Sequence, residues 1–416
     1  IVTMSFVDQT SGSVAHCEAM AAQFPDLAEP YYNKIASYCQ QKLWHQLTLA
    51  VLDFVGNPQA NLRPLDAELK NTCVAMYQKV VLVVAAKLNA LSLARIAASA
   101  AISSLASGSI TVDESKALLQ ELLDKQETGK PHTTATILYL QSKIGLLQLQ
   151  HTQDTSKEGL SGIYSTIKTN APLLNQLLPD TPEAMVVNAA HYEMSMTYYK
   201  LIGPPEAYYN EAIHYLNYYQ PTAENVTQSH ALAVDLSLAA LTGEGVYNLG
   251  QVVTNPIVQV LQGTSEAWLV ELLQACAKGS VAEFKTMCSQ TYPSQIASQP
   301  ALVHMGQQMQ EKMTLLALVE MVFERPASER TLEFTDIATR LEIPLEQVEW
   351  VLMRAFSVKL MEGIMDQVDG TVHITWVLPR TLSNEQMADL AGRFGEWAGK
   401  VSKTQEYMQE NATLAA

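Results

Sequence analysis

The chain has 416 residues, and its 26 lysines and arginines against 42 aspartates and glutamates give a formal net charge of −16. Hydrophobic residues make up 48% of the sequence and charged residues only 16%, which excludes an intrinsically disordered chain. The acidic balance argues against a cationic face for nucleic acid over most of the surface. The length exceeds what one hydrophobic core supports, so we expect at least two packed units. A surface this poor in charge predicts contacts with other proteins.

The cysteines and the hydropathy of the sequence indicate the cell compartment. The five cysteines form no CxxC pair, and their odd number does not support a disulfide framework or a zinc ribbon. We therefore expect reduced thiols and a location in the cytoplasm and nucleus. The most apolar run, residues 80–86, is far shorter than the roughly 20 residues of a membrane span, so no membrane contact is predicted.

Residues 30–321 have the pattern of one helix after another. Leu43, Leu47 and Val51 recur at helical spacing, and no strand-like alternation interrupts the stretch. Turn signals such as Gly203-Pro204 and Asn255-Pro256 recur at short intervals, as they do between stacked helical hairpins. The sequence therefore predicts a mostly α fold: an irregular TPR-like helical solenoid, then a winged helix and a C-terminal bundle helix. The expected boundaries are a variable segment 1–30, a helical repeat arm 31–310, a winged helix 311–380 and the bundle helix 381–416.

The winged helix is predicted from residues 331–380. Ile337, Ala338 and Leu341 mark a short helix, and the apolar residues of 348–356 follow the spacing of a second amphipathic helix. Asp369-Gly370 then lies between two β-rich runs, which is typical of a tight hairpin. A two-residue turn would pair Val368 with Thr371, Met365 with Ile374 and Asp366 with His373. In that register one face, packed on the second helix, would carry the following side chains: Met365, Val372, Ile374 and Trp376.

The last helix is predicted to begin near Ser383, which is a plausible N-cap. Its apolar side chains advance by alternating steps of three and four residues, which is the seam of a helical bundle or coiled coil. The seam consists of Met387, Leu390, Phe394, Trp397, Val401, Thr404 and Met408. A lone helix cannot bury such a seam by itself. The seam could dock on the helix's own domain, but a bundle formed with other chains is the more specific interpretation.

The sequence lacks the common motifs of catalytic and phosphate-binding sites. There is no HExxH motif, no GxxxxGK[ST] phosphate loop and no GxSxG nucleophile elbow. Residues 243–250 resemble a dinucleotide fingerprint only faintly, because the glycine spacing is wrong and no strand precedes them. A turn between two helices is the better interpretation. We therefore predict no enzyme, no catalytic residue, no metal and no cofactor.

Nucleic-acid binding is the main alternative function for a winged helix. Residues 331–380 contain four basic and eight acidic side chains, so their balance is 4 − 8 = −4. Glu346 and Glu349 lie at the start of the helix that would enter the DNA groove. Phosphate repulsion at that point predicts that the domain contacts other proteins instead of nucleic acid.

A helical arm that leads into a winged helix and a bundle helix resembles the PCI-domain proteins. These are scaffold subunits shared by the proteasome lid, the COP9 signalosome and a translation-initiation factor. The resemblance is carried by residues 42–54, 243–250 with Asn255-Pro256, 323–327, 332–338 and 372–380. It is strongest with a subunit of the proteasome lid, and scaffolds of the two related complexes are the near alternative.

The resemblance implies a non-catalytic role in the lid of the 19S regulatory particle. Its expected partners are the other PCI subunits of the lid, the lid deubiquitinase pair through the helical bundle, and the ubiquitin-receptor subunit near the helical arm. An open edge along residues 371–376 would let neighbouring sheets join. The residues expected at interfaces are Val372, Ile374 and Trp376 on this strand and Met387, Leu390, Phe394, Trp397, Val401 and Met408 on the seam.

Overall fold

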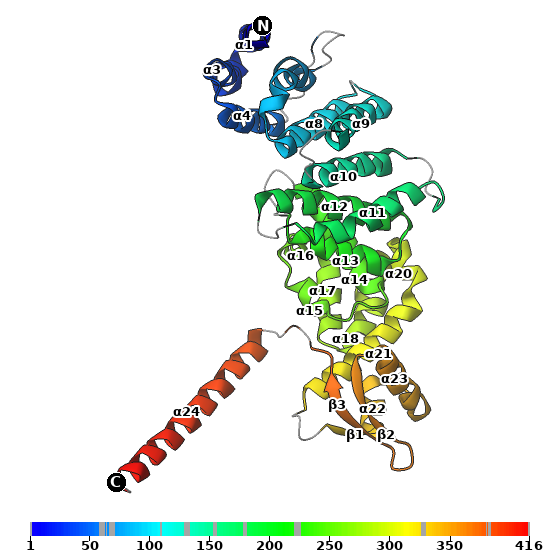
Figure 1. Cartoon of the computed structure of the whole chain (residues 1–416). Helices are drawn as coiled ribbons and strands as arrows, with labels where there is room; N and C mark the ends of the chain where they lie inside the picture. The colour runs from blue at the N-terminus through cyan, green and yellow to red at the C-terminus, as the bar shows by residue number, and fades with distance from the viewer. Residues whose placement is uncertain are drawn as a thin grey trace. The chain divides into compact units, whose positions relative to one another are not determined.

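The computed structural model describes residues 2–57, 63, 65, 71–108, 110–128, 134–152, 156–177, 181–219, 226–325, 330–379, 381 and 384–414. The chain divides into two compact units, residues 1–220 and residues 221–416 (Figure 1). Almost all of the regular structure described is helical, in agreement with the predicted fold class. The predicted N-cap Ser383 lies outside the described residues, as does Arg380.

The first unit is a stack of helices. They are α1 (Val2–Gln23), α2 (Pro25–Leu27), η1 (Ala28–Tyr32), α3 (Asn33–Gln41), α4 (Trp44–Gly56), α6 (Thr72–Met76), η2 (Tyr77–Val81), α7 (Leu82–Val84), η3 (Ala85–Lys87), α8 (Ala90–Ala106), α9 (Val112–Thr128), α10 (Thr134–His151), α11 (Ser161–Leu174), α12 (Pro182–Ile202) and α13 (Pro205–Leu216). Consecutive helices pack on one another, α8 on α9, α9 on α10, and α12 on α10 and α13, as hairpins in a solenoid do (Figure 1).

Capping and turn residues set the ends of these helices, and the predicted turn at Gly203-Pro204 is one of them. The Asn89 side chain accepts a hydrogen bond of 2.9 Å from the amide of Leu91 and so caps α8. The Thr181 hydroxyl accepts one from the amide of Ala184 at the start of α12. The residues that follow α12, Gly203 and Pro204, end one helix and start the next. Local capping therefore fixes where each hairpin of the stack turns.

The second unit continues with helices and ends in the winged helix. Its helices before the sheet are α14 (Val226–Thr242), α15 (Leu249–Val253), α16 (Pro256–Gln259), α17 (Ala267–Ala277), α18 (Val281–Thr286), η5 (Met287–Thr291), α19 (Pro293–Ser298), α20 (Pro300–His304) and α21 (Gly306–Phe323). Then follow β1 (Thr331–Glu333), α22 (Phe334–Leu341), α23 (Leu345–Ser357), β2 (Met361–Asp366), β3 (Thr371–Val377) and α24 (Asn384–Leu414). The segment 243–248 connects α14 with α15, so its interpretation as a turn between helices is confirmed.

A buried lysine closes the end of α14. Lys312 of α21 is 7% exposed, and its Nζ donates hydrogen bonds of 2.6 Å to the Ala240 carbonyl and 2.8 Å to the Gly243 carbonyl. These oxygens lie at the C-terminal end of α14, where carbonyls lack partners within the helix and the helix dipole favours a cation. The side chain thus ties α21 to the connection between α14 and α15.

The sheet of the winged helix has three antiparallel strands in the order β1–β3–β2. Its inner face packs on α22 and α23, and the core side chains Ile337, Val348, Leu352 and Val372 are fully buried. The sequence predicted both helices and the two long strands. Strand β1 was missed because three residues are too few to show alternation.

The predicted hairpin register is wrong. Asp366 pairs with Thr371 and Met365 with Val372, so the turn has four residues, 367–370, instead of two. The reason is the Asp366 side chain, whose Oδ1 accepts hydrogen bonds from the amides of Val368 at 2.9 Å and Asp369 at 3.1 Å. Gly370 closes the turn in a left-handed conformation with φ of 63°. His373 consequently lies opposite Ile364 and Thr331, not Asp366.

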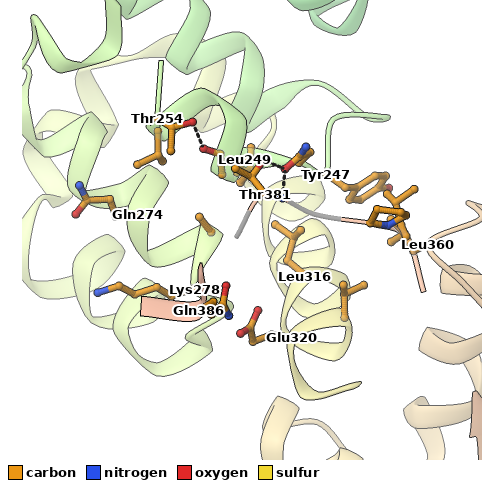
Figure 2. A pocket seen from close by; sticks show the side chains of 17 residues that line it. Tyr247, Leu249, Thr254, Gln274, Lys278, Leu316, Glu320, Leu360, Thr381 and Gln386 are labelled. Atoms are coloured by element: carbon orange, nitrogen blue, oxygen red, sulfur yellow. Dashed lines mark hydrogen bonds between the residues drawn. The ribbon is translucent and has the colours of Figure 1, made fainter. Parts of the chain in front are cut away.

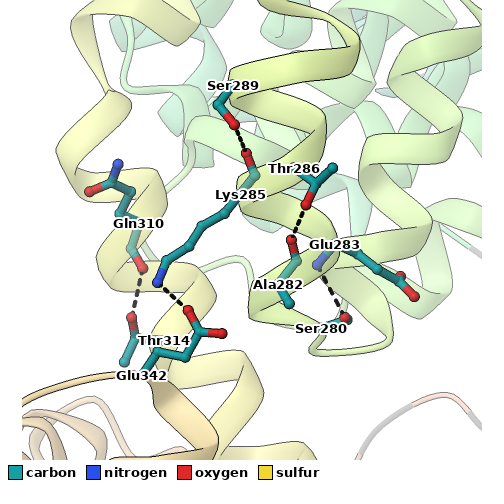
Figure 3. Close-up of polar contacts among 9 residues, drawn as sticks. All are labelled: Ser280, Ala282, Glu283, Lys285, Thr286, Ser289, Gln310, Thr314 and Glu342. Carbon is teal, nitrogen blue, oxygen red and sulfur yellow. Dashed lines mark hydrogen bonds and ion pairs between the residues drawn. The ribbon is translucent and has the colours of Figure 1, made fainter.

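Ion pairs connect the winged helix to the helices before it. Lys285 of α18 reaches Glu342, in the turn after α22, with an Nζ–Oε2 distance of 2.6 Å (Figure 3). Arg354 of α23 contacts Glu311 of α21 at 2.9 Å. These side chains are partly exposed, so each pair stabilises the junction by at most about 1 kcal/mol. The apolar contacts of α21 with α22 and α23 contribute the larger share.

Candidate protein-interaction surfaces

The predicted interface residues of β3 lie on opposite faces of the sheet. Val372 and Ile374 are 0% and 2% exposed and belong to the core of the winged helix, so their side chains are not available at a surface. Trp376 is 40% exposed on the outer face. The predicted shared face is therefore wrong for Trp376.

A β-bulge causes this separation. Glu362 pairs with Trp376 but Gly363 already pairs with Ile374, so Thr375 is an extra residue on β3. One extra residue reverses the alternation, which turns Trp376 away from the core and Val377 into it. Gly363 allows the close approach, since a Cβ there would lie 2.4 Å from the His373 carbonyl oxygen.

The predicted open edge along residues 371–376 is also wrong. Strand β3 is the central strand, and it pairs with β1 on one side and β2 on the other. Among the described residues, the strands with an unpaired side are the three-residue β1 and the six-residue β2. Any joining of sheets would therefore use one of these strands.

The seam of α24 is exposed along its whole described length. Phe394 is 63% and Trp397 65% exposed, and the remaining apolar seam residues are also exposed: Met387, Leu390, Val401 and Met408. Thr404, the polar member of the seam, is exposed too. Exposing this much large apolar surface to water is unfavourable for an isolated protein.

Thr381, between β3 and α24, is held against the α14–α15 connection. The Asn248 Oδ1 accepts hydrogen bonds from the Thr381 amide at 3.3 Å and from the Thr381 hydroxyl at 3.0 Å (Figure 2). Gly250 lies so close that a Cβ there would be 3.1 Å from the Thr381 Cβ. Beside this contact is a pocket of about 420 Å³, lined by residues that include Leu316, Glu320 and Gln386. The contact holds Thr381 in place, and the sequence carried no signal for it.

Three further features of the described residues concern metal binding, thiol reactivity and membrane-spanning helices. No group of three or more His, Cys, Asp or Glu side chains lies close enough to hold a metal ion there. Burial raises the pKa of the Cys17, Cys73 and Cys276 thiols to about 12 in each case, so these thiols stay protonated and unreactive at neutral pH. In the same part of the chain, none of the helices combines the length and apolar character that a bilayer crossing needs.

Comparisons with known proteins agree with this architecture. A family model described as PSD13 N-terminal repeats matches residues 31–273, and a PCI domain model matches residues 289–376. The chain is 32% identical over 396 residues to 26S proteasome non-ATPase regulatory subunit 13 homolog A of Arabidopsis thaliana, covering 94% of this chain and 96% of the relative. It is 28% identical over 389 residues to 26S proteasome regulatory subunit RPN9 of Saccharomyces cerevisiae, covering 91% and 92%.

A shorter match reaches a related complex. The chain is 26% identical over 198 residues to eukaryotic translation initiation factor 3 subunit M of Coccidioides immitis, which covers 48% of this chain and 41% of the relative. The matches to proteasome subunits span nearly the whole chain, and the repeat model alone matches more than half of it. The chain belongs to the family of 26S proteasome non-ATPase regulatory subunit 13.

Proposed function

We propose that this chain is a non-catalytic scaffold subunit of the 26S proteasome lid, within the 19S regulatory particle, and that it supports ubiquitin-dependent protein degradation. The observation that carries the proposal is the exposed seam of α24 on a chain of this family. The seam residues Phe394 and Trp397 would be covered by helices of other subunits in a shared bundle. This coverage would offset the cost of their exposure in the isolated chain.

The proposal extends to partners and compartment. Other PCI subunits would contact the winged helix, and the lid deubiquitinase pair would share the bundle with α24. The ubiquitin-receptor subunit would lie near the helical arm. The cell compartments that suit such a subunit are the cytoplasm and the nucleus.

The test is affinity purification of the tagged full-length chain from its own cells, with quantification of the proteins recovered. We expect lid and ATPase-ring subunits in even proportion. The double variant Phe394→Asp, Trp397→Asp should lose them, because two carboxylates in an apolar bundle core are costly to bury. Lys403→Asp is the matched control, since it adds the same side chain to α24 outside the seam.

Two results would contradict the proposal. Normal incorporation of the double variant would show that the seam is not buried in the particle. Recovery of translation-initiation-factor or signalosome subunits would instead favour a scaffold of a related complex, the second candidate that the match to initiation factor 3 subunit M supports.

A further inference from the structure

The outward face of α23 carries large apolar side chains that the fold does not use. Trp350 is 54% exposed, Met353 49% and Leu345 53%. The inward face of the same helix already supplies the core, through Val348, Val351, Leu352 and Ala355. Since Trp350 and Met353 are three residues apart, they lie next to each other on the helix surface. Leu345, Glu346, Glu349, Trp350 and Met353 are called the α23 face below.

Carboxylates border this apolar surface. Glu346 and Glu349 are on the α23 face itself, one turn before Trp350 and Met353 respectively. The Gln367 Nε2 donates a hydrogen bond of 3.0 Å to the Glu349 Oε2, which places the β2–β3 turn beside α23. Two exposed carboxylates lie there: Asp366 at the end of β2 and Asp369 in the turn.

The basic side chains of residues 345–370, all of which the structure describes, do not balance these carboxylates. Arg354, the basic residue in the last turn of α23, has its Nε 2.9 Å from the Glu311 carboxylate of α21. Lys359 lies beyond the end of the helix. Trp350 and Met353 thus form an apolar patch on the α23 face, with the carboxylates of Glu346 and Glu349 one turn before it.

The stability of α23 explains the position of Glu346 but not the exposed apolar side chains beside it. A glutamate in the first turn of a helix, such as Glu346, interacts favourably with the helix dipole. That argument does not extend to Trp350 or Met353, which gain little from half-exposed positions in the free chain. Tryptophan and methionine are enriched at the centres of protein interfaces, where tryptophan is a frequent hot spot.

We propose that the α23 face docks an amphipathic helix of a partner protein whose apolar stripe is bordered by lysine and arginine. Trp350 and Met353 would contact the apolar stripe, and Glu346 and Glu349 would pair with the flanking cations. The same carboxylates repel nucleic acid and acidic segments, which gives the site its specificity. This surface is separate from the α24 seam and does not depend on it.

The test uses the full-length chain and two synthetic helical peptides with the same leucine stripe. One peptide carries lysine and arginine beside the stripe, and the other carries glutamate at those positions. Fluorescence anisotropy of the labelled peptides should show binding of the basic peptide, weakened by added salt, and little binding of the acidic one. Trp350→Ala and Glu349→Lys should each weaken the basic peptide about tenfold.

Controls separate this site from other exposed apolar surfaces. Ile364→Ala, on the outer face of the sheet, should leave the affinity unchanged. Equal binding of the two peptides would overturn the proposal, as would unchanged affinity in Trp350→Ala with its fold verified by circular dichroism. A loss confined to Phe394→Ala would assign the peptide to α24. Salt-dependent binding of duplex DNA that Glu349→Ala strengthens would point to nucleic acid instead.

Discussion

At the scale of single residues, two buried polar side chains show how the helices are held. His191 of α12 is 2% exposed, and burial lowers its pKa from 6.5 to about 4. Lys312 of α21 is buried as a cation, because carbonyl oxygens at the end of α14 accept its hydrogen bonds. Burial keeps the His191 imidazole neutral, whereas the carbonyl oxygens around Lys312 keep its ammonium group charged.

The His191 environment predicts acid sensitivity of the first unit. The imidazole is protonated near pH 6.5 in the unfolded chain but only near pH 4 in the folded one. Its contribution to stability is therefore complete above about pH 6.5 and falls as the pH drops toward 4, by up to about 3 kcal/mol. Urea unfolding at several pH values measures this. His191→Asn should flatten the slope, and equal slopes for both proteins would contradict the assignment.

Lys312→Met should lower the free energy of unfolding by about 2–3 kcal/mol, because the α14 carbonyls would remain buried without their charged donor. The methionine keeps most of the apolar stem. Lys285→Met is the matched control, since Lys285 is largely exposed in its pair with Glu342 and should change stability by less than about 1 kcal/mol. Denaturant unfolding of both variants provides the comparison, and equal losses would refute the role given to Lys312.

At the scale of elements, one extra residue decides which side chains of β3 face solvent. The bulge at Thr375 separates Ile374, in the core, from Trp376, on the outer face. Its formation requires a strand partner without a side chain, which Gly363 provides. The wing turn likewise depends on Asp366 accepting two backbone amides.

Gly363→Ala should destabilise the winged helix by about 1–3 kcal/mol, because the added methyl would overlap the His373 carbonyl and force the strands apart. Thermal unfolding of the full-length chain measures the change. Gly306→Ala serves as the control, since nothing lies within 4 Å of a Cβ there and the position is helical. A Gly363→Ala protein as stable as the control would argue against the close approach.

At the scale of the whole molecule, the low charge density and the exposed seam of α24 have the same explanation. A chain with 16% charged residues and large apolar side chains in water on its last helix is suited to an assembly. Tertiary packing supplies most of the stability of a helix, and the seam of α24 is exposed throughout its described part.

The isolated chain should therefore exchange the backbone amides of α24 rapidly, and the same amides should become protected in the assembled particle. Hydrogen–deuterium exchange with mass spectrometry detects both states. Amides of α17, whose side chains are mostly buried, should exchange slowly in both and serve as the internal reference. Slow exchange of α24 in the isolated chain would mean that its seam is already covered.

The sequence by itself determined the helices, the two wing strands and the seam of α24. Each of these follows from local rules: apolar spacing, capping residues such as Asn255, and turn residues such as Asp369-Gly370. The family resemblance rested on short segments along the chain, and the relatives agree with it. Position along a helix is periodic, so the seam residues could be chosen without knowing what they contact.

Only the tertiary structure decided the strand register, the central place of β3, the burial of Val372 and Ile374, and the contact between Asn248 and Thr381. The physical reason is the same in each case. The faces of a strand depend on a bulge that forms opposite a particular residue of its partner, and an edge depends on which strand pairs there. A hydrogen bond across 133 positions of sequence depends on chain paths that no local pattern encodes. Local periodicity fixes each element, whereas pairing between distant elements decides which of its side chains remain on the surface.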